Sequence, residues 1–270
     1  MTKTKVLVTG ASGQVGYLVY SRLLSKPDQF DVYGVDRKQE ASGRVPGSWD
    51  LNLPPDKFSV IDLSDFDAVA EAVSDMDVVA HLGADPEGRE WDSVLNNNIV
   101  GTYNVFEASR QAGVKRVVGA SSIMVSEGHR EREPYRAMME RRFDDIPETF
   151  DTVSPAIPAE PRGIYAASKV WLESLARVYS NRHDMSCLCV RIGQVERDRP
   201  RPPQGADIYV SQRDITQIWE KAIVAPNDLR FGIFYGMSNN DYRWIDINAA
   251  RDTIGFAPED RAEDKHNYDV

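Results

Sequence analysis

The chain contains little sulfur and few histidines. Only two of its 270 residues are cysteine and four are histidine. Cys187 and Cys189 stand two apart, so in a strand their Cα atoms would be about 6.6 Å apart, near the upper limit for a disulfide. The histidines do not follow any metal-ligand spacing. We therefore expect no disulfide, no metal site, and two buried thiols in a reducing compartment.

Long apolar runs and an excess of positive charge are also absent. No stretch is apolar over enough residues to cross a bilayer, and a strand-like run begins at Lys5 with no secretory signal before it. The formal net charge is −10, which disfavours nucleic acid or an anionic membrane surface as a partner. We expect a cytoplasmic globular protein with a small-molecule substrate, no nucleic-acid partner and no membrane partner.

Short β-branched runs alternate with helical patterns along the chain. Strands are predicted at 5–10, 31–36, 58–62, 77–83, 115–122 and 185–193, and helices at 14–25, 65–75, 91–113 and around 163–182. Continuous apolar strands separated by helices are typical of a parallel sheet that is covered on both faces. The pattern therefore predicts an α/β fold, a Rossmann-type doubly wound sheet, in a single domain over residues 1–270.

Three segments interrupt this alternation. Residues 37–57 are rich in Gly, Pro and Ser and are predicted to form a surface excursion, and 196–205 form a basic, proline-punctuated loop. Residues 126–162 are charged and proline-rich, with a possible helix at 135–145. A helix at 211–223, a strand at 231–236 and a weak helix at 246–254 follow. We expect small substrate-binding elements within 126–162 and 194–260.

The stretch TGASGQVG, residues 9–16, joins the first strand to the first helix, with glycines at 10, 13 and 16. Such a turn lets the backbone approach a pyrophosphate and directs a helix N-terminus at it. It predicts cofactor contacts from Gly10, Ser12, Gly13, Gln14, Val15 and Gly16. Asp36 closes the second strand, where its carboxylate can accept both ribose hydroxyls, so NAD is favoured over NADP. The adjacent Arg37 softens that preference because it can pair with a phosphate.

The stretch GIYAASK, residues 163–169, places Tyr165 four positions before Lys169. This spacing puts both side chains on one face of a helix, as in many ordinary surface helices. It also suits catalysis, because a nearby ammonium and an oxidised nicotinamide lower the pKa of a tyrosine from its usual value near 10. The spacing alone does not separate the two interpretations.

Taken together, several motifs resemble the extended short-chain dehydrogenase/reductase family, the broad group of NAD-dependent epimerases and dehydratases. They are TGxxGxxG, Asp36, Asp62-Leu63, NNNIVGT (96–102), Ser121-Ser122 and YAASK. The resemblance implies that Tyr165 is the base, Ser122 the catalytic serine, and Lys169 a partner of Tyr165 and of the nicotinamide ribose. It implies that Asn98 is a structural and proton-relay residue. It also implies cofactor contacts from Asp62, Leu63, Leu82, Gly83, Ala84 and Ile192.

Departures from the wider family narrow the expected reaction. Ile123-Met124 follow Ser122 where sugar-nucleotide dehydratases carry an acidic pair, so dehydration is not expected. Only 101 residues follow Lys169, which favours a small substrate over a nucleotide sugar. The sequence is most similar to uronate dehydrogenases and archaeal NAD-dependent glucose-6-phosphate dehydrogenases. The similar pieces are WDSVLNNNIVGT, ASS, YAASK, VRIG (190–193), VSQRD (210–214) and YGMSNND (235–241).

In those groups the segment after VRIG reaches the anionic end of the substrate. Here it holds Arg197, Arg199 and Arg201, whose guanidinium groups can pair bidentately with a carboxylate or phosphate. A solvated basic loop is the alternative. Ile123-Met124 also replace the asparagine–histidine of the uronate dehydrogenases, which weakens the expectation of uronate itself. We expect substrate contacts from Asp85, Ser122, Ile123, Tyr165, Arg197, Arg199 and Arg201.

The expected activity is NAD-dependent oxidation of a small, possibly anionic sugar at its hemiacetal hydroxyl. An epimerase that retains NAD, a reductase of a small ketone and a non-catalytic nucleotide sensor are the alternatives. In many relatives the helices corresponding to 91–113 and 163–182 form a dimer interface, so we expect a homodimer. Trp171, Leu172 and Leu175 could then be core or interface residues, which periodicity does not distinguish.

Overall fold

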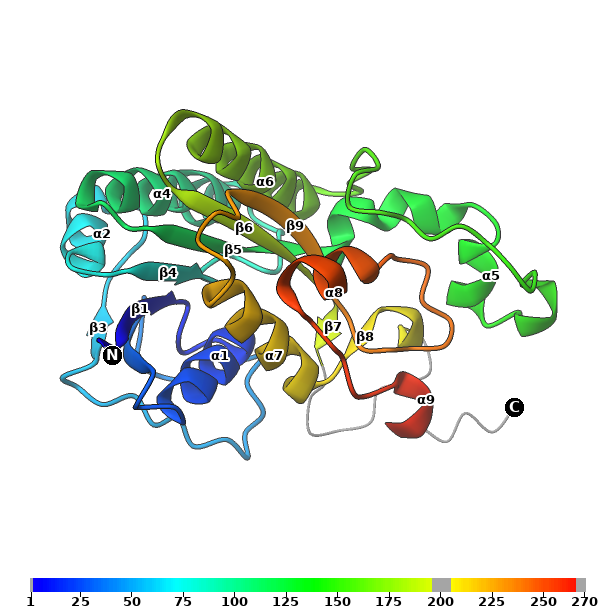
Figure 1. Cartoon of the computed structure of the whole chain (residues 1–270), viewed down its shortest axis with the longest axis horizontal. Coiled ribbons are helices and arrows are strands. Elements are labelled where there is room, and N and C mark those ends of the chain that lie inside the picture. The colour runs from blue at the N-terminus through cyan, green and yellow to red at the C-terminus, as the bar shows by residue number, and fades with distance from the viewer. Residues whose placement is uncertain (1, 196–204, 266–270) are drawn as a thin grey trace.

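The computed structural model describes residues 2–195 and 205–265, so Arg197, Arg199 and Arg201 lie outside it. Its centre is a seven-stranded parallel sheet with strand order β3-β2-β1-β4-β5-β6-β9 (Figure 1). The strands are β1 Thr4–Thr9, β2 Phe30–Asp36, β3 Phe58–Val60, β4 Val78–His81, β5 Arg116–Ser122, β6 Ser186–Ile192 and β9 Phe231–Gly236. The predicted Rossmann-type sheet is confirmed.

Helices cover both faces of the sheet, as the apolar strands required. On one face lie α1 (Gln14–Leu24), α7 (Gln212–Ile223) and α8 (Asn248–Ile254); on the other lie α2 (Phe66–Val73), α4 (Gly101–Ala112) and α6 (Ile164–Arg182) (Figure 1). Trp219 of α7 is fully buried in the first core, and Phe106 of α4 in the second. Both cysteines are buried free thiols in β6, as predicted.

Local signals in the sequence set several helix ends. The Asp65 carboxylate accepts hydrogen bonds from the N–H groups of Asp67 and Ala68, at 3.1 and 3.2 Å, and so caps α2. Gly113 ends α4 with a φ of 73°, in the left-handed region that favours glycine. Each such cap contributes about 1 kcal/mol. These ends agree with the predicted bounds to within a few residues.

The predicted single helix at 91–113 is wrong in its interior. The structure has α3 (Trp91–Val94), a π-helical turn (Leu95–Val100) and then α4. The Asn97 side chain donates to the Ser93 carbonyl oxygen at 2.7 Å, within this widened turn. A single i→i+5 turn inside a longer helix is not marked by any particular residue type, so the sequence pattern does not reveal it. It lies beside the segment after β4, where it places Asn98.

The segments between β5 and β9 and after β9 form a third core of their own. It includes Ile123, Met138, Ile208 and Trp244. Its elements include a 3₁₀ segment (Ile123–Glu131), α5 (Tyr135–Glu140) and a 3₁₀ turn (Ala206–Ile208). The short strands β7 (Gln194–Val195) and β8 (Tyr209–Val210) contribute Val195 and Val210 to the first core, and α9 (Ala262–Lys265) follows near the end of the described chain. The helix predicted at 135–145 is shorter, because Arg141 adopts a left-handed conformation with φ 60°. In the described residues, no helix is long and apolar enough to span a membrane.

The chain packs closely where α1 passes over the first turn. A Cβ atom added at Gly16 would stand 1.9 Å from the Gly10 carbonyl oxygen, whereas at Gly43 it would meet nothing within 4 Å. We expect Gly16→Ala to lower the free energy of unfolding by more than about 2 kcal/mol because the turn must open. Gly43→Ala is the control and should change it by less than about 0.5 kcal/mol. Urea unfolding of both variants checks this, and equal stabilities would contradict the packing argument.

Candidate active site

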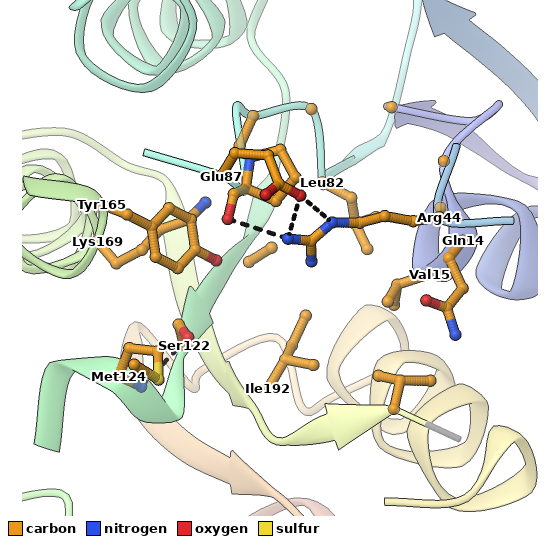
Figure 2. A pocket seen from close by; sticks show the side chains of 18 of the residues that line it. Gln14, Val15, Arg44, Leu82, Glu87, Ser122, Met124, Tyr165, Lys169 and Ile192 are labelled. Atoms are coloured by element: carbon orange, nitrogen blue, oxygen red, sulfur yellow. Dashed lines mark hydrogen bonds and ion pairs between the residues drawn. The ribbon is translucent and has the colours of Figure 1, made fainter. Parts of the chain in front are cut away.

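A cavity of about 1020 Å³ lies at the carboxyl ends of the parallel strands, where α/β proteins bind ligands (Figure 2). It brings together most of the residues that the sequence predicted for the site. They are Gly10, Ser12, Gly13, Gln14, Val15, Gly16, Asp36, Arg37, Leu63, Leu82, Gly83, Ala84, Ser122, Ile123, Tyr165, Lys169 and Ile192. Asp62, Asp85 and Asn98 do not line the cavity.

The glycine turn forms one end of the cavity. Gly10 has a φ of 71°, and a Cβ atom there would stand 2.7 Å from the Gly83 nitrogen. The Gly13 N–H donates to the Gly10 carbonyl at 3.0 Å, and α1 then starts at Gln14 without a side-chain cap. An uncapped helix N-terminus beside bare backbone suits an anionic group such as a pyrophosphate. The turn therefore fits a dinucleotide.

Asp36 stands at the end of β2, beside this turn. Its carboxylate accepts from the Ser12 N–H at 3.1 Å and from the Arg37 N–H at 2.7 Å. These two bonds fix the carboxylate at the mouth of the cavity, where ribose hydroxyls can donate to it. Arg37 and Lys38 line the cavity next to it.

A buried histidine that sequence reasoning missed holds the segment after β4. Thr9 Oγ1 accepts from the N–H groups of Leu82 and Gly83, at 3.1 and 3.0 Å. Its own proton is therefore donated to His81 Nδ1 at 2.9 Å, and His81 Nε2–H donates to Thr102 Oγ1 at 3.1 Å. Burial, with Lys169 nearby, lowers the pKa of His81 to about 3. His81 is therefore a neutral structural link behind the cavity wall.

The other end of the cavity carries the three predicted reacting residues. Ser122 and Lys169 are buried, while Tyr165 is half-buried. Figure 2 shows the Tyr165 ring and Ser122 facing one another across this end of the cavity, and Ser122 acts to lower the pKa of the Tyr165 hydroxyl. Lys169 Nζ lies 5.6 Å from the centre of the Tyr165 ring. The structure thus joins the end of β5 to the first turns of α6 at one reacting point.

Burial shifts the pKa values of both Tyr165 and Lys169. It raises the pKa of Tyr165, against the lowering effect of the Ser122 hydrogen bond and of the Arg44 charge. It lowers the pKa of Lys169 to about 8. Without a further positive charge nearby, Tyr165 stays protonated at neutral pH. A cation bound beside it, such as an oxidised nicotinamide, would favour the phenolate and make Tyr165 a base.

Asn98 lies behind the cavity rather than on its wall. Its side chain accepts from the Asp85 N–H at 2.6 Å and donates to the Asp85 carbonyl at 3.0 Å and to Ser168 Oγ at 2.9 Å. It therefore ties the segment after β4 to α6, which is the structural half of its expected role. The Asp85 carboxylate turns that segment by accepting from the N–H groups of Glu87 and Gly88, at 2.8 and 3.3 Å.

Arg44 and Glu87 meet across the mouth of the cavity, as Figure 2 shows. Arg44 Nε and Nη2 lie 2.9 and 2.6 Å from Glu87 Oε1. They come from the excursion after β2 and the segment after β4, and nothing in the sequence pattern signals their pairing. Among residues 2–195 and 205–265, no group of three or more His, Cys, Asp or Glu side chains is arranged to hold a metal ion.

Comparison with known proteins gives the family. Residues 6–230 match the model of the NAD dependent epimerase/dehydratase family. The chain belongs to that family. It is therefore an enzyme of the group that the sequence motifs indicated, and NAD is the cofactor that the family's description names.

Two relatives and one solved structure match nearly the whole chain. The NAD-dependent glucose-6-phosphate dehydrogenase of Haloferax volcanii is 33% identical over 95% of this chain and 94% of its own. The L-arabinose 1-dehydrogenase (NAD(P)(+)) of the same organism is 28% identical over 96% of this chain and 97% of its own. A mutant of the uronate dehydrogenase from Agrobacterium tumefaciens, complexed with NAD, has a TM-score of 0.76 at 27% identity, covering 97% of this chain and 87% of its own.

The buried ammonium of Lys169 makes a prediction about stability. Its pKa in the folded protein is about 8, below the ordinary value of 10.5. At pH 7 the unfolded chain therefore holds this proton more readily, and the penalty disappears as the pH rises toward 10.5. We expect Lys169→Met to raise the free energy of unfolding at pH 7 by up to about 3 kcal/mol, a gain that shrinks by pH 10.

Urea unfolding at pH 7 and pH 10 measures this difference. Lys115→Met is the control, because the Lys115 side chain is 79% exposed and its pairing with Asp77 lies at the surface. It should change stability little at either pH. A Lys169→Met variant that is less stable than the wild type at pH 7 would show that the buried ammonium is better compensated than its surroundings indicate.

Proposed function

We propose that this protein is an NAD-dependent dehydrogenase that oxidises a small sugar at its hemiacetal hydroxyl and forms a lactone. One observation carries the proposal: a single cavity joins the dinucleotide turn at Gly10–Gly16 to the Ser122–Tyr165 pair. The relatives act on glucose 6-phosphate, L-arabinose and uronate by their names. The shared element of those substrates is a cyclic sugar with an oxidisable anomeric carbon.

The reaction follows from the chemistry of the residues. NAD, held against the Gly10–Gly16 turn, would supply the oxidant, an acceptor for the hydride of the anomeric carbon. The Tyr165 phenolate takes the proton of the hydroxyl on that carbon, so that the carbonyl forms as the hydride leaves. Ser122 Oγ–H donates to the same oxygen and holds it beside Tyr165. Lys169 supports the phenolate from the next turn of α6.

The choice of NAD rests on Asp36. Its fixed carboxylate suits the two hydroxyls of an unmodified ribose and would repel a 2′-phosphate. Arg37 and Lys38 stand close enough to the cavity to weaken this discrimination without reversing it. We infer that NADP binds less tightly than NAD.

An anionic group on the substrate is supported by the cations around the cavity. Within the described part of the chain, Arg37, Lys38, Arg44, Arg162 and Lys169 line it. Arg162, directly before Gly163 and three residues before Tyr165, lies on the proposed substrate side and pairs with Glu131. The proposed clamp of Arg197, Arg199 and Arg201 lies outside the described residues and stays a prediction.

A substrate panel tests the function. Purified protein is mixed with NAD⁺ and glucose 6-phosphate, glucuronate, galacturonate or L-arabinose, and absorbance at the reduced-nicotinamide band is followed. We expect turnover of one of these sugars, with kcat reduced at least about 10²-fold in Tyr165→Phe because the base is lost. Tyr179→Phe is the matched control on the same helix; its hydroxyl donates to Glu107 at 2.8 Å, and it should leave kcat unchanged.

Other outcomes separate the alternatives. If no sugar in the panel is oxidised and NAD stays bound through purification, an epimerase that oxidises and re-reduces its substrate is favoured. If no sugar is oxidised and NADH binds and dissociates freely, a ketone reductase is favoured. Wild-type turnover by Tyr165→Phe would remove Tyr165 from the mechanism altogether.

We further propose that the protein is a cytoplasmic homodimer. Cytoplasmic location is supported by the two buried free thiols. Dimerisation is supported by large apolar side chains left exposed on α3, α4 and α6: Trp91, Tyr103, Trp171 and Val178 are 38–55% exposed. Leu172 and Leu175, by contrast, lie in the core, at 1% and 7% exposed. Figure 1 shows α4 and α6 side by side on the outer surface of the sheet.

If α4 and α6 form the dimer interface, glutamate substitutions at two exposed valines should affect association differently. Val178 on α6 is 47% exposed, and Val224 at the end of α7 is 53% exposed. We expect Val178→Glu to convert the dimer to a monomer, because a buried unpaired carboxylate opposes association. Val224→Glu should leave it dimeric. Analytical ultracentrifugation of both variants decides, and a wild type that sediments as a monomer would refute the dimer directly.

A further inference from the structure

A buried polar network lies beneath the reacting side chains. Ser121 Oγ donates to Glu173 Oε1 at 2.5 Å. Arg191 donates to the same carboxylate through Nε at 2.8 Å and Nη2 at 2.9 Å. Ser121, Glu173 and Arg191 are 1%, 6% and 2% exposed. A charged pair and a hydroxyl are thus satisfied inside the protein: Ser121 lines the cavity, and Glu173 and Arg191 lie behind its wall.

The sheet register places this network in the row next to Ser122. Ser121 on β5 pairs with Arg191 on β6, which pairs with Tyr235 on β9. Arg191 Nη1 completes the row by donating to the Tyr235 hydroxyl at 2.8 Å. The next row in the same register begins with Ser122 and Ile192, which line the cavity.

The spacing of residues along α6 also places Glu173 near the reacting residues. Glu173 lies four residues after Lys169 and eight after Tyr165 on α6, and therefore on the same face of that helix. The Ser121–Glu173 hydrogen bond therefore joins the two elements that carry the reacting groups. It does so one residue from Ser122 and one helical turn from Lys169.

This arrangement has a consequence beyond stability. A buried ion pair often contributes no more to stability than an apolar pair of similar size. What a charge-assisted, bidentate pair provides is a fixed position for the carboxylate. Ser121 uses that fixed carboxylate as its acceptor, so the end of β5 is held at one distance from α6.

We propose that Ser121 is a positioning residue whose hydrogen bond to Glu173 sets the placement of Ser122 against Tyr165. Glu173 and Arg191 do not line the cavity, and the network acts through the Ser122–Tyr165 pair. The inference rests on the proposed function only in taking that pair as the reacting pair.

The charged groups facing Tyr165 remain unchanged when Ser121 is replaced. They are Lys169 on its own helix, Arg44 from the excursion after β2 and Asp85 from the segment after β4. Ser121→Ala removes a neutral hydroxyl and leaves the Glu173–Arg191 pair intact. Any change in the titration of Tyr165 would then report its hydrogen bond with Ser122, and not a changed field.

The experiment compares Ser121→Ala with Ser180→Ala. Ser180 is also a buried serine that tethers α6, through a 3.0 Å bond to the Arg230 carbonyl, but at the far end of the helix. Tyrosines are replaced by 3-fluorotyrosine, and the fluorine resonance of Tyr165, assigned by its loss in Tyr165→Phe, is titrated with pH at saturating NAD⁺. We expect Ser121→Ala to move the midpoint upward by about one unit, because a bond that favours the phenolate is weakened. Ser180→Ala should leave it unchanged.

Turnover gives a second readout. With whichever panel sugar the wild type oxidises, Ser121→Ala should lower kcat about tenfold with little change in KM for NAD⁺. The double variant Glu173→Met/Arg191→Met removes the acceptor of Ser121 without a net change of charge. Provided that it folds by circular dichroism, it should reproduce the defect of Ser121→Ala.

Equal midpoints and equal kcat in Ser121→Ala, Ser180→Ala and the wild type would overturn the proposal, as would a folded double variant with a wild-type titration. The fluorine titration needs no substrate. If no sugar in the panel is oxidised, the proposed function fails while the titration still decides the role of Ser121.

Discussion

The parallel register of β1, β4, β5 and β6 is the constraint on which the site depends. Because all four strands run in one direction, their carboxyl ends meet at one edge, and the segment after each strand opens into the same cavity. Gly10 follows β1, Leu82 follows β4 and Ser122 ends β5. A one-residue slip of β5 would exchange the faces toward which Ser121 and Ser122 point, and would turn Ser122 away from Tyr165. The buried row of Ser121, Arg191 and Tyr235 opposes such a slip, because it fits only one register.

The sequence predicted what depends on short spacing. Tyr165 and Lys169 are one helical turn apart, and the glycines at 10, 13 and 16 lie within seven consecutive residues. The spacing of these residues in the sequence therefore largely determines how they lie in space. The Ser121–Glu173 bond spans 52 residues, and Arg44 meets Glu87 across 43. Such contacts are fixed by tertiary packing, and no local signal indicates them. The π-turn at Leu95–Val100 was missed because a single i→i+5 turn within a longer helix is not marked by any particular residue type.

At this site the fold keeps the Lys169 ammonium group away from water, which lowers the stability of the folded protein. Lys169 is 4% exposed, and its lowered pKa shows that burial disfavours its ammonium form. The same burial raises the pKa of Tyr165. In the protein without a bound cofactor, Tyr165 is therefore protonated at neutral pH, and the charged form of Lys169 is disfavoured. A bound cation would shift the balance toward phenolate, which links proton removal to the presence of an oxidised cofactor.

The two ends of the cavity differ in how firmly the fold determines them. The dinucleotide end is built from the sheet and α1, within the main cores, and the close contact of Gly10 with Gly83 leaves it little freedom. The substrate end is bounded by Ile123, Met124 and Ile208, which pack with Trp244 in the separate third core. That core contacts the sheet through the ends of β5 and β9, so its residues can change without disturbing the cofactor site. This separation explains why short motifs could predict the Gly10–Gly16 turn and the Ser122–Tyr165 pair, while the proposed sugar's identity depends on long-range packing among segments 123–153 and 206–247.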